Sequence, residues 1–206
     1  MRGTKLPDHH VTDHTSDAEL IARARAGDDL AFGVLVKRYE GAIAATVIGM
    51  LGRGDDADDV GQETFIRFHR SLHRFRGESS LKTYLVHIAM NLSINALKRR
   101  RRSLLRFVSR DEHDVDLPEP RVGPDGEVDA HELQQFVRAA VAQLGEKHRA
   151  VVVLRLFQDY STKETAQILG VPDGTVLSRL SRAMKELEAR LAPYVRHGST
   201  LPESIL

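Results

Sequence analysis

A chain of 206 residues accommodates one ordinary domain or two small ones. With 41% hydrophobic residues and a mean hydropathy of −0.32 it can form hydrophobic cores, but no apolar run approaches the ~18 residues that cross a bilayer. Cysteine is absent, which excludes disulfides and cysteine nucleophiles. The polar N-terminus lacks the apolar middle of a secretory signal, so we expect a cytoplasmic protein without membrane insertion.

The formal net charge is only +1, but the charges are unevenly distributed. Residues 98–110 include seven basic side chains and no acidic one. Residues 111–129 include eight acidic side chains and one arginine. Such a reversal suggests a functional basic end followed by a solvated acidic tether.

Helical periodicity is the only regular signal in the first hundred residues. It predicts four helices, over 17–26, 29–51, 55–75 and 80–102. A short polar residue that can cap a helix starts each of them: Ser16 (with Glu19 as a capping box), Asp28, Asp55, and Ser79 or Ser80. Glycines 27 and 52 end the first two helices, and the segment 76–78 breaks the third.

Residues 111–128 contain three prolines and no helical period, which indicates a flexible linker. Four more helices are predicted near 129–143, 146–157, 162–169 and 173–191. No alternating strand pattern occurs. We therefore expect an all-α fold of two small helical domains joined by a flexible acidic linker. The expected divisions are a tail at 1–15, a domain at 16–105, the linker at 106–128, a domain at 129–195 and a tail at 196–206.

Residues 161–187 have the pattern of a helix-turn-helix. Ala166 is small where the helices would cross, Gly170 can end the first helix, and Asp173 can cap the second after Pro172. The second helix has an apolar stripe of Val176, Leu180, Met184, Leu187 and Leu191. The opposite side carries Thr175, Ser178, Arg179, Arg182 and Lys185. This polar side suits a reader of the DNA major groove, although a solvated helical hairpin would look similar.

The predicted helix over 55–75 has two distinct faces. Its buried stripe is Ala57, Val60, Phe68, Leu72 and Phe75. The opposite side carries Asp59, Gln62, Glu63, Ile66 and Arg70. An isoleucine among carboxylates and an amide is typical of a protein-docking face, but a single exposed isoleucine can also mean little.

The predicted helix over 80–102 buries Leu81, Leu85, Ile88, Leu92 and Ala96. About a third of a turn away it aligns His87, Asn91, Asn95 and Lys98. Asparagine and histidine can bond base edges, and the basic run 98–102 can clamp phosphates. Basic residues at a helix end also complement its dipole, but five in succession exceed that need.

The connecting segment 71–84 combines Phe75 and Tyr84 with cations and hydroxyl groups. Aromatic rings in such a setting suit unstacked single-stranded bases. The same rings could instead belong to the core under an ordinary turn, and the segment alone does not decide between the two.

Together, these segments resemble the extracytoplasmic-function sigma factors of the sigma-70 family. Residues 55–102 resemble sigma region 2, residues 17–40 match the start of that domain, and 160–191 resemble region 4. The resemblance implies a sigma factor that binds core RNA polymerase, recognises the −35 and −10 promoter elements and promotes promoter melting and initiation. It implies no enzymatic activity, catalytic residue, cofactor or metal, and it makes an anti-sigma factor a candidate partner.

The resemblance also implies residue roles. In the family, the segment at 59–65 docks on the clamp coiled coil of polymerase β′, which points to Asp59, Gln62 and Glu63, with Ile66 beside them. The implied −10 DNA-binding residues are Phe75, Arg76, Glu78, Ser79, Ser80, Lys82, Tyr84, His87, Asn91, Asn95, Lys98 and Arg99. The implied −35 DNA-binding residues are Thr175, Ser178, Arg179, Arg182 and Lys185. The apolar side of region 4 would meet the polymerase β flap.

The chain departs from the family pattern at two positions. Tyr84 replaces the usual tryptophan, and Thr165 replaces a large aliphatic residue, which we expect to loosen the packing of region 4. Three rival functions fit some of these features: a stand-alone regulator, a metal-dependent enzyme and an RNA-binding protein. A stand-alone regulator would carry an α/β sensor domain, for which the sequence shows no strand pattern. A metal-dependent enzyme is disfavoured because none of the ten histidines is paired on a helix at the spacing of metal ligands. Selective binding to structured RNA, without affinity for polymerase, would favour the RNA-binding protein.

Overall fold

The computed structural model describes residues 15–107 and 130–195, and regular structure in these ranges is helical throughout, which confirms the predicted all-α fold. The N-terminal half (15–107) contains α1 (Asp17–Arg25), α2 (Asp29–Leu51), α3 (Asp55–Ser71), a 3₁₀ turn (Leu72–Arg74) and α4 (Leu81–Phe107). The C-terminal half (130–195) contains α5 (Ala130–Ala142), α6 (Glu146–Val152), a π turn (Val153–Phe157), α7 (Thr162–Leu169) and α8 (Asp173–Val195). The predicted tails and linker lie outside the described residues, apart from Thr15 and residues 106–107, and the latter two extend α4.

Three predicted N-caps are confirmed by backbone amides that donate to the capping side chain: Glu19 to Ser16 (3.3 Å), Ala31 to Asp28 (3.1 Å) and Thr83 to Ser80 (3.1 Å). Two predicted caps were wrong, because Asp55 and Asp173 are the first residues of α3 and α8. Gly54 stands at the cap of α3, and the Pro172 carbonyl accepts from the first turn of α8. An aspartate in the first turn still complements the positive end of the helix.

Two predicted helix ends also differ. The α-helical part of α3 stops at Ser71, short of Phe75, because the chain tightens into the 3₁₀ turn. Helix α4 continues to Phe107, beyond the expected end near Arg102, since residues 103–107 include neither glycine nor proline to break it. The left-handed Gly170 (φ 62°, ψ 41°) ends α7 as predicted.

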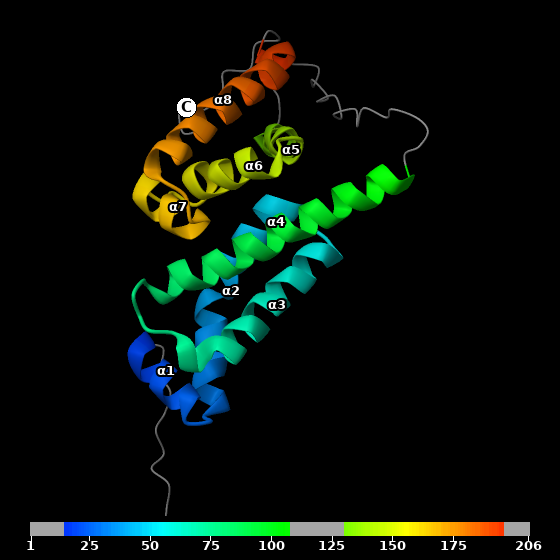
Figure 1. The fold of residues 1–206 in the computed structure, drawn as a ribbon. Coiled ribbons are helices and arrows are strands. Elements are labelled where there is room, and N and C mark those ends of the chain that lie inside the picture. The colour runs from blue at the N-terminus through cyan, green and yellow to red at the C-terminus, as the bar shows by residue number, and fades with distance from the viewer. Residues whose placement is uncertain (1–14, 108–129, 196–206) are drawn as a thin grey trace, which may run out of the picture.

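Helices α1, α3 and α4 surround α2 in the N-terminal half (Figure 1). The stripe predicted for α3 is buried at Ala57, Val60, Phe68 and Leu72, whereas Phe75 is half-buried. The stripe predicted for α4 is buried at Leu81, Leu85 and Leu92, whereas Ile88 and Ala96 are half-buried. Helix α4 also buries Val86, Ala89, Met90 and Ser93, which the sequence analysis did not include. These residues are covered because α4 is packed on a second side.

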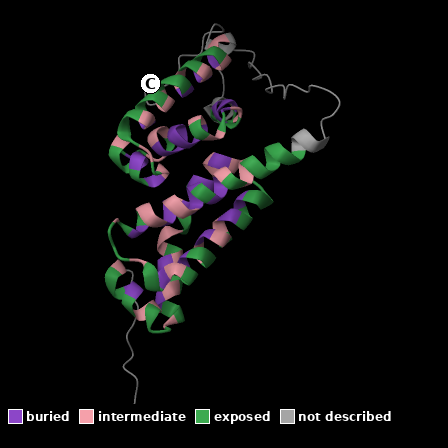
Figure 2. Ribbon diagram, in the orientation of Figure 1, coloured by how far each residue is buried: buried purple, intermediate pink, exposed green. Residues whose placement is uncertain are grey.

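That second side belongs to the C-terminal half. Figure 1 shows α4 running across the molecule, with α3 on one flank and α6 and α7 on the other. Figure 2 shows buried residues along α4 and along the helices that face it. The apolar stripe of α8 packs on α5 and α6, with Val176, Leu187 and Leu191 buried as predicted and Leu180 and Met184 half-buried. The two halves are therefore in direct contact.

Candidate nucleic-acid interface

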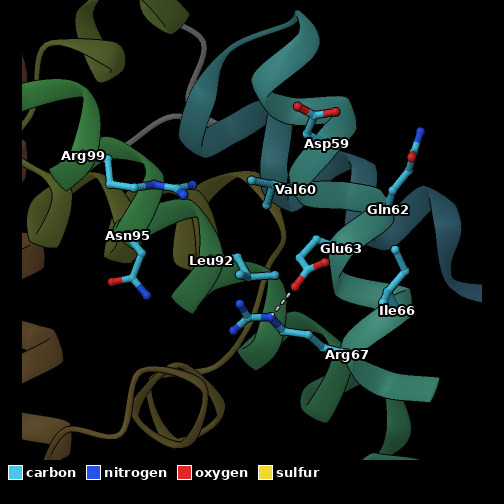
Figure 3. Close-up of a pocket in the computed structure, with 9 residues that line it drawn as sticks. All are labelled: Asp59, Val60, Gln62, Glu63, Ile66, Arg67, Leu92, Asn95 and Arg99. Carbon is cyan, nitrogen blue, oxygen red and sulfur yellow. Dashed lines mark hydrogen bonds and ion pairs between the residues drawn. The ribbon is translucent and has the colours of Figure 1, made fainter. Parts of the chain in front are cut away.

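The outer face of α3 is accessible, as predicted. Asp59, Gln62 and Ile66 are exposed, and the Ile66 side chain keeps 44% of its surface in contact with solvent. Glu63 is half-buried and accepts a 2.8 Å hydrogen bond from Arg67 one turn later. Figure 3 shows Gln62 and Ile66 on α3, and both are among the residues that line a groove shared with α4. This face combines carboxylate, amide and aliphatic groups in a form that another protein can contact.

An open groove of about 540 Å³ lies between α3 and α4 (Figure 3). Asp59, Glu63 and Arg67 line it from α3, and Asn95 and Arg99 line it from α4. The resemblance implied polymerase binding for Asp59 and Glu63 and DNA binding for Asn95 and Arg99. The structure brings them together, so that a protein bound on α3 and DNA bound on α4 would be neighbours.

The loop between α3 and α4 is held from beneath. The Arg25 side chain of α1 donates to the Leu72 carbonyl at 3.0 Å and also to the carbonyl of Phe75. The Phe75 and Tyr84 rings lie 4.9 Å apart between centroids, and both contact Phe68. Arginine from another helix therefore fixes the path of the loop.

The two loop rings are half-buried against the core, which supports their structural role. The Tyr84 hydroxyl lies 3.0 Å from Ser71 Oγ, so this tyrosine also links α4 to the end of α3. Arg76, Glu78 and Ser80 are exposed, and Ser79 is half-buried. The Arg76–Glu78 ion pair, 4.0 Å long and mostly exposed to solvent, adds little stability. The polar members of the loop are the accessible ones.

The four polar residues aligned along α4, which are His87, Asn91, Asn95 and Lys98, lie in two different environments. Asn91, Asn95 and Lys98 are exposed, as is the rest of the basic run up to Arg102. His87, by contrast, donates from Nδ1 to the Ile168 carbonyl of α7 at 2.7 Å, and its Nε2 accepts from Asn91 at 3.0 Å. Both contacts fix the tautomer of the ring with its proton on Nδ1.

Lys82, near the start of the same helix, also faces the C-terminal half. Its Nζ lies 5.2 Å from the centre of the Tyr160 ring, within the range of a cation–π contact. Burial and the nearby Glu164 raise the pKa of Tyr160 to about 12, so the ring stays neutral. His87 is thus bonded to the C-terminal half and the exposed Lys82 lies over one of its rings, and neither contact was predicted from the sequence.

The polar side of α8 is presented to solvent. Ser178, Arg182 and Lys185 are exposed, and Thr175 and Arg179 are half-buried. The helix that precedes it, α7, begins with a full capping box in which Ser161 and Glu164 bond each other's backbone amides at 2.8 and 3.2 Å. In a helix-turn-helix the second helix enters the major groove, and here this helix is α8, whose polar side is accessible.

Sequence reasoning missed the residues that join the halves, chiefly Gly49 and Arg149. Arg149 is 8% exposed and reaches the Met50 carbonyl at 2.7 Å. Arg149 directly precedes an apolar run, but its partner carbonyl is 99 residues away in the sequence. Among the described residues, no group of three potential ligands could hold a metal ion, and no helix is long and apolar enough to cross a membrane.

The described residues form two helical regions, and the second contains a helix-turn-helix of the kind that binds DNA. Family models match both halves: Sigma-70 region 2 over residues 35–103 and Sigma-70, region 4 over residues 136–187. The ECF RNA polymerase sigma-E factor of Haemophilus influenzae is 32% identical over 190 residues, which span 90% of this chain and 100% of that protein. The RNA polymerase sigma-H factor of Pseudomonas aeruginosa is 32% identical over 191 residues, 87% of this chain and 96% of that protein.

The chain therefore belongs to the extracytoplasmic-function sigma factors of the sigma-70 family, the promoter-recognising subunits that act with RNA polymerase in transcription initiation. The structure of CnrH in complex with the cytosolic domain of CnrY is similar, with a TM-score of 0.61, 26% identity, and coverage of 84% of this chain and 96% of that one. The sigma factor RpoE of Bartonella quintana, in complex with the anti-sigma factor NepR, shares the fold, with a TM-score of 0.60, 24% identity, and coverage of 78% and 96%.

Proposed function

We propose that this sigma factor docks on the β′ clamp coiled coil through Asp59, Gln62, Glu63 and Ile66 on α3. The loop at 75–80 and the exposed row of α4 would hold the −10 element, and the polar side of α8 would read the −35 element. On this proposal residues 16–105 act as region 2 and residues 129–195 as region 4. The observation that carries it is the groove between α3 and α4, since its α3 side suits a protein and its α4 side suits nucleic acid.

The protein acts by binding rather than by catalysis. Extracting a base from the duplex costs a few kcal/mol, and capture of that base by the loop offsets the cost. Promoter opening is then a population shift, because the sigma factor binds the melted DNA more tightly than the closed duplex. The work is done in the cytoplasm, where polymerase and promoter are found.

An anti-sigma factor is a further proposed partner. The two similar solved structures are complexes, one with the cytosolic domain of CnrY and one with the anti-sigma factor NepR. A comparable protein that binds the exposed α3 face would deny this face to polymerase. Such a partner would hold the present chain inactive until it is released.

Reconstitution with sigma-free core polymerase tests the proposal. Transcripts made from genomic fragments should begin at a small set of new sites that share −35 and −10 elements. Two variants should fail at different steps. Ile66→Glu should lose co-elution with core polymerase but keep affinity for a −35 duplex, whereas Arg182→Ala should lose the duplex but keep the co-elution. A wild-type protein that neither co-elutes with core polymerase nor starts transcripts would overturn the proposed function.

A further inference from the structure

Leu177 is an exposed leucine near the start of α8. The residue is 55% exposed, although its chain neighbour Val176 is completely buried. The other large apolar residues of α8 up to Leu191 lie in the core or pack against it: Val176, Leu180, Met184, Leu187 and Leu191. Leu177 therefore contributes little to the core, and its apolar surface is left in contact with water.

The position of Leu177 separates it from the other exposed apolar residues. Among the described residues, the large hydrophobic side chains that are exposed are Leu30, Ile66, Phe157 and Leu177. A single exposed leucine means little by itself. Of these four, however, Leu177 alone belongs to the second helix of the helix-turn-helix, and the N-terminal residues of such a helix contact base edges in the major groove.

The surroundings of Leu177 contain no cation at helical spacing. Its neighbours three and four residues away are Asp173, Gly174, Leu180 and Ser181. Arg179 is about 200° around the helix from Leu177, on the other flank. The exposed Arg182 and Lys185 come further along α8. The exposed face of α8 therefore begins with a part that lacks basic side chains and continues into a basic part.

The serine next to Leu177 uses its proton within the helix. Ser178 Oγ donates to the Thr175 carbonyl at 3.1 Å, so this hydroxyl offers lone pairs rather than a proton to a ligand. The backbone amide of Thr175 donates in turn to the Pro172 carbonyl at 2.9 Å, which fixes the first turn. The start of the exposed face thus presents an apolar group rather than hydrogen-bond donors.

Gly174 leaves the helix backbone uncovered one turn before Leu177. A Cβ atom at this position would meet nothing within 4 Å, so packing within the described part of the chain does not require a glycine there. Glycine is also a poorer helix former than alanine. The missing side chain allows another molecule to approach the backbone closely and keeps the space beside Leu177 open.

The apolar feature of the major groove is the methyl group of thymine. Guanine, cytosine and adenine present hydrogen-bond donors and acceptors there, whereas thymine adds its C5-methyl group, which apolar side chains contact. A leucine has no group that can form a hydrogen bond. The methyl group of thymine is therefore the base feature that Leu177 can recognise directly.

We propose that Leu177 is a specificity-determining residue for the −35 element and that its side chain packs on the C5-methyl group of a thymine in that element. The protein then prefers an A·T pair at the contacted position, with the thymine on the strand that faces the start of α8. The inference rests on the proposed function, because it needs α8 to lie in the major groove of the −35 element.

Removal of single methyl groups from the DNA tests the contact. The probes are duplexes of the promoters mapped with the reconstituted holoenzyme, in which each thymine of the −35 element is replaced in turn by uracil. Uracil pairs as thymine does but lacks the methyl group. One of these replacements should weaken binding of the wild-type holoenzyme about fourfold, the effect of one buried methyl group.

Leu177→Ala in the same holoenzyme completes the test. The variant should bind the unmodified duplex several-fold more weakly than the wild type and should be indifferent to the uracil that weakens the wild type. Such coupling between one side chain and one methyl group indicates direct contact, which a general change in helix packing would not produce. Leu30→Ala is the matched control, because Leu30 is 76% exposed and lies on α2. It should keep the full sensitivity to uracil, and circular dichroism should show both variants folded.

The outcomes separate this inference from the proposed function. Wild-type holoenzyme that is indifferent to every uracil replacement would overturn the methyl contact, as would a −35 element without thymine on either strand. The same holds for a Leu177→Ala variant that keeps the sensitivity of the wild type. The proposed function fails on a different observation, namely wild-type holoenzyme that does not initiate at sites sharing a −35 element.

Discussion

Arg149 Nη1 of α6 donates a 2.7 Å hydrogen bond to the carbonyl oxygen of Met50, the residue before the last of α2. The final carbonyls of a helix have no donor within the helix, and the last turn of α2 contains no basic side chain. Arg149 supplies both a donor and a positive charge from the other half of the chain. Burial, with a smaller contribution from Arg100, lowers its pKa to about 10, so the guanidinium remains charged at neutral pH.

Arg149→Met should destabilise the protein. The substitution keeps much of the side-chain volume but removes the donors to the Met50 and Leu144 carbonyls. Hydrogen bonds to charged groups contribute about 1.5–3 kcal/mol, so the free energy of unfolding should fall by about that amount. Urea unfolding followed by circular dichroism measures the change. Arg138→Met, at an exposed position of α5, is the matched control, and an equal effect of the two variants would contradict the role given to Arg149.

A second prediction concerns Thr165, which replaces the usual large aliphatic residue. Its side chain is completely buried, and its Oγ1 has no hydrogen-bond partner among the described residues. A buried unpaired hydroxyl costs about 1–3 kcal/mol, so the isosteric Thr165→Val should raise the free energy of unfolding by about 1 kcal/mol. Thr64→Val is the control, because the equally buried Thr64 hydroxyl donates to the Val60 carbonyl at 2.7 Å. If both variants shift stability alike, the unpaired hydroxyl is not the cause.

The sequence predicted the features that depend on near neighbours. Ser16 and Gly170 mark helix ends through contacts within a few residues. The exposed face of α3 was predictable because successive residues of an α-helix are rotated by about 100° around its axis. The second buried side of α4 could not be predicted in this way. Val86 and Met90 are covered by elements far along the chain, and no pattern among neighbouring residues identifies those elements. For the same reason Lys82 and His87 were assigned to DNA without the contacts that now occupy them.

The capping box of α7 should give a pH-dependent contribution to stability. Hydrogen bonds from the Ser161 hydroxyl and backbone amide hold the pKa of Glu164 below its usual value of 4.5. Because the folded pKa is lowered, the contribution is fully present above the unfolded pKa and is lost as the pH falls through the folded pKa. Glu164→Gln should therefore be less stable than wild type at pH 7, and the difference should shrink in acid. Urea unfolding at both pH values checks this, with Glu188→Gln as an exposed acidic control.

The basic end of α4 should determine how strongly salt weakens DNA binding. Lys98 to Arg102 are all exposed, so their charges are free to meet phosphates. Each lost phosphate contact reduces the slope of log K against log salt by about 0.7 for single strands and 0.9 for duplex. Arg101→Gln with Arg102→Gln should therefore flatten the slope by about 1.4–1.8 for the holoenzyme on promoter DNA, measured by fluorescence anisotropy at several salt concentrations. Arg138→Gln on α5 should leave the slope unchanged. If the double variant also left it unchanged, the phosphate clamp would have to lie elsewhere on the protein.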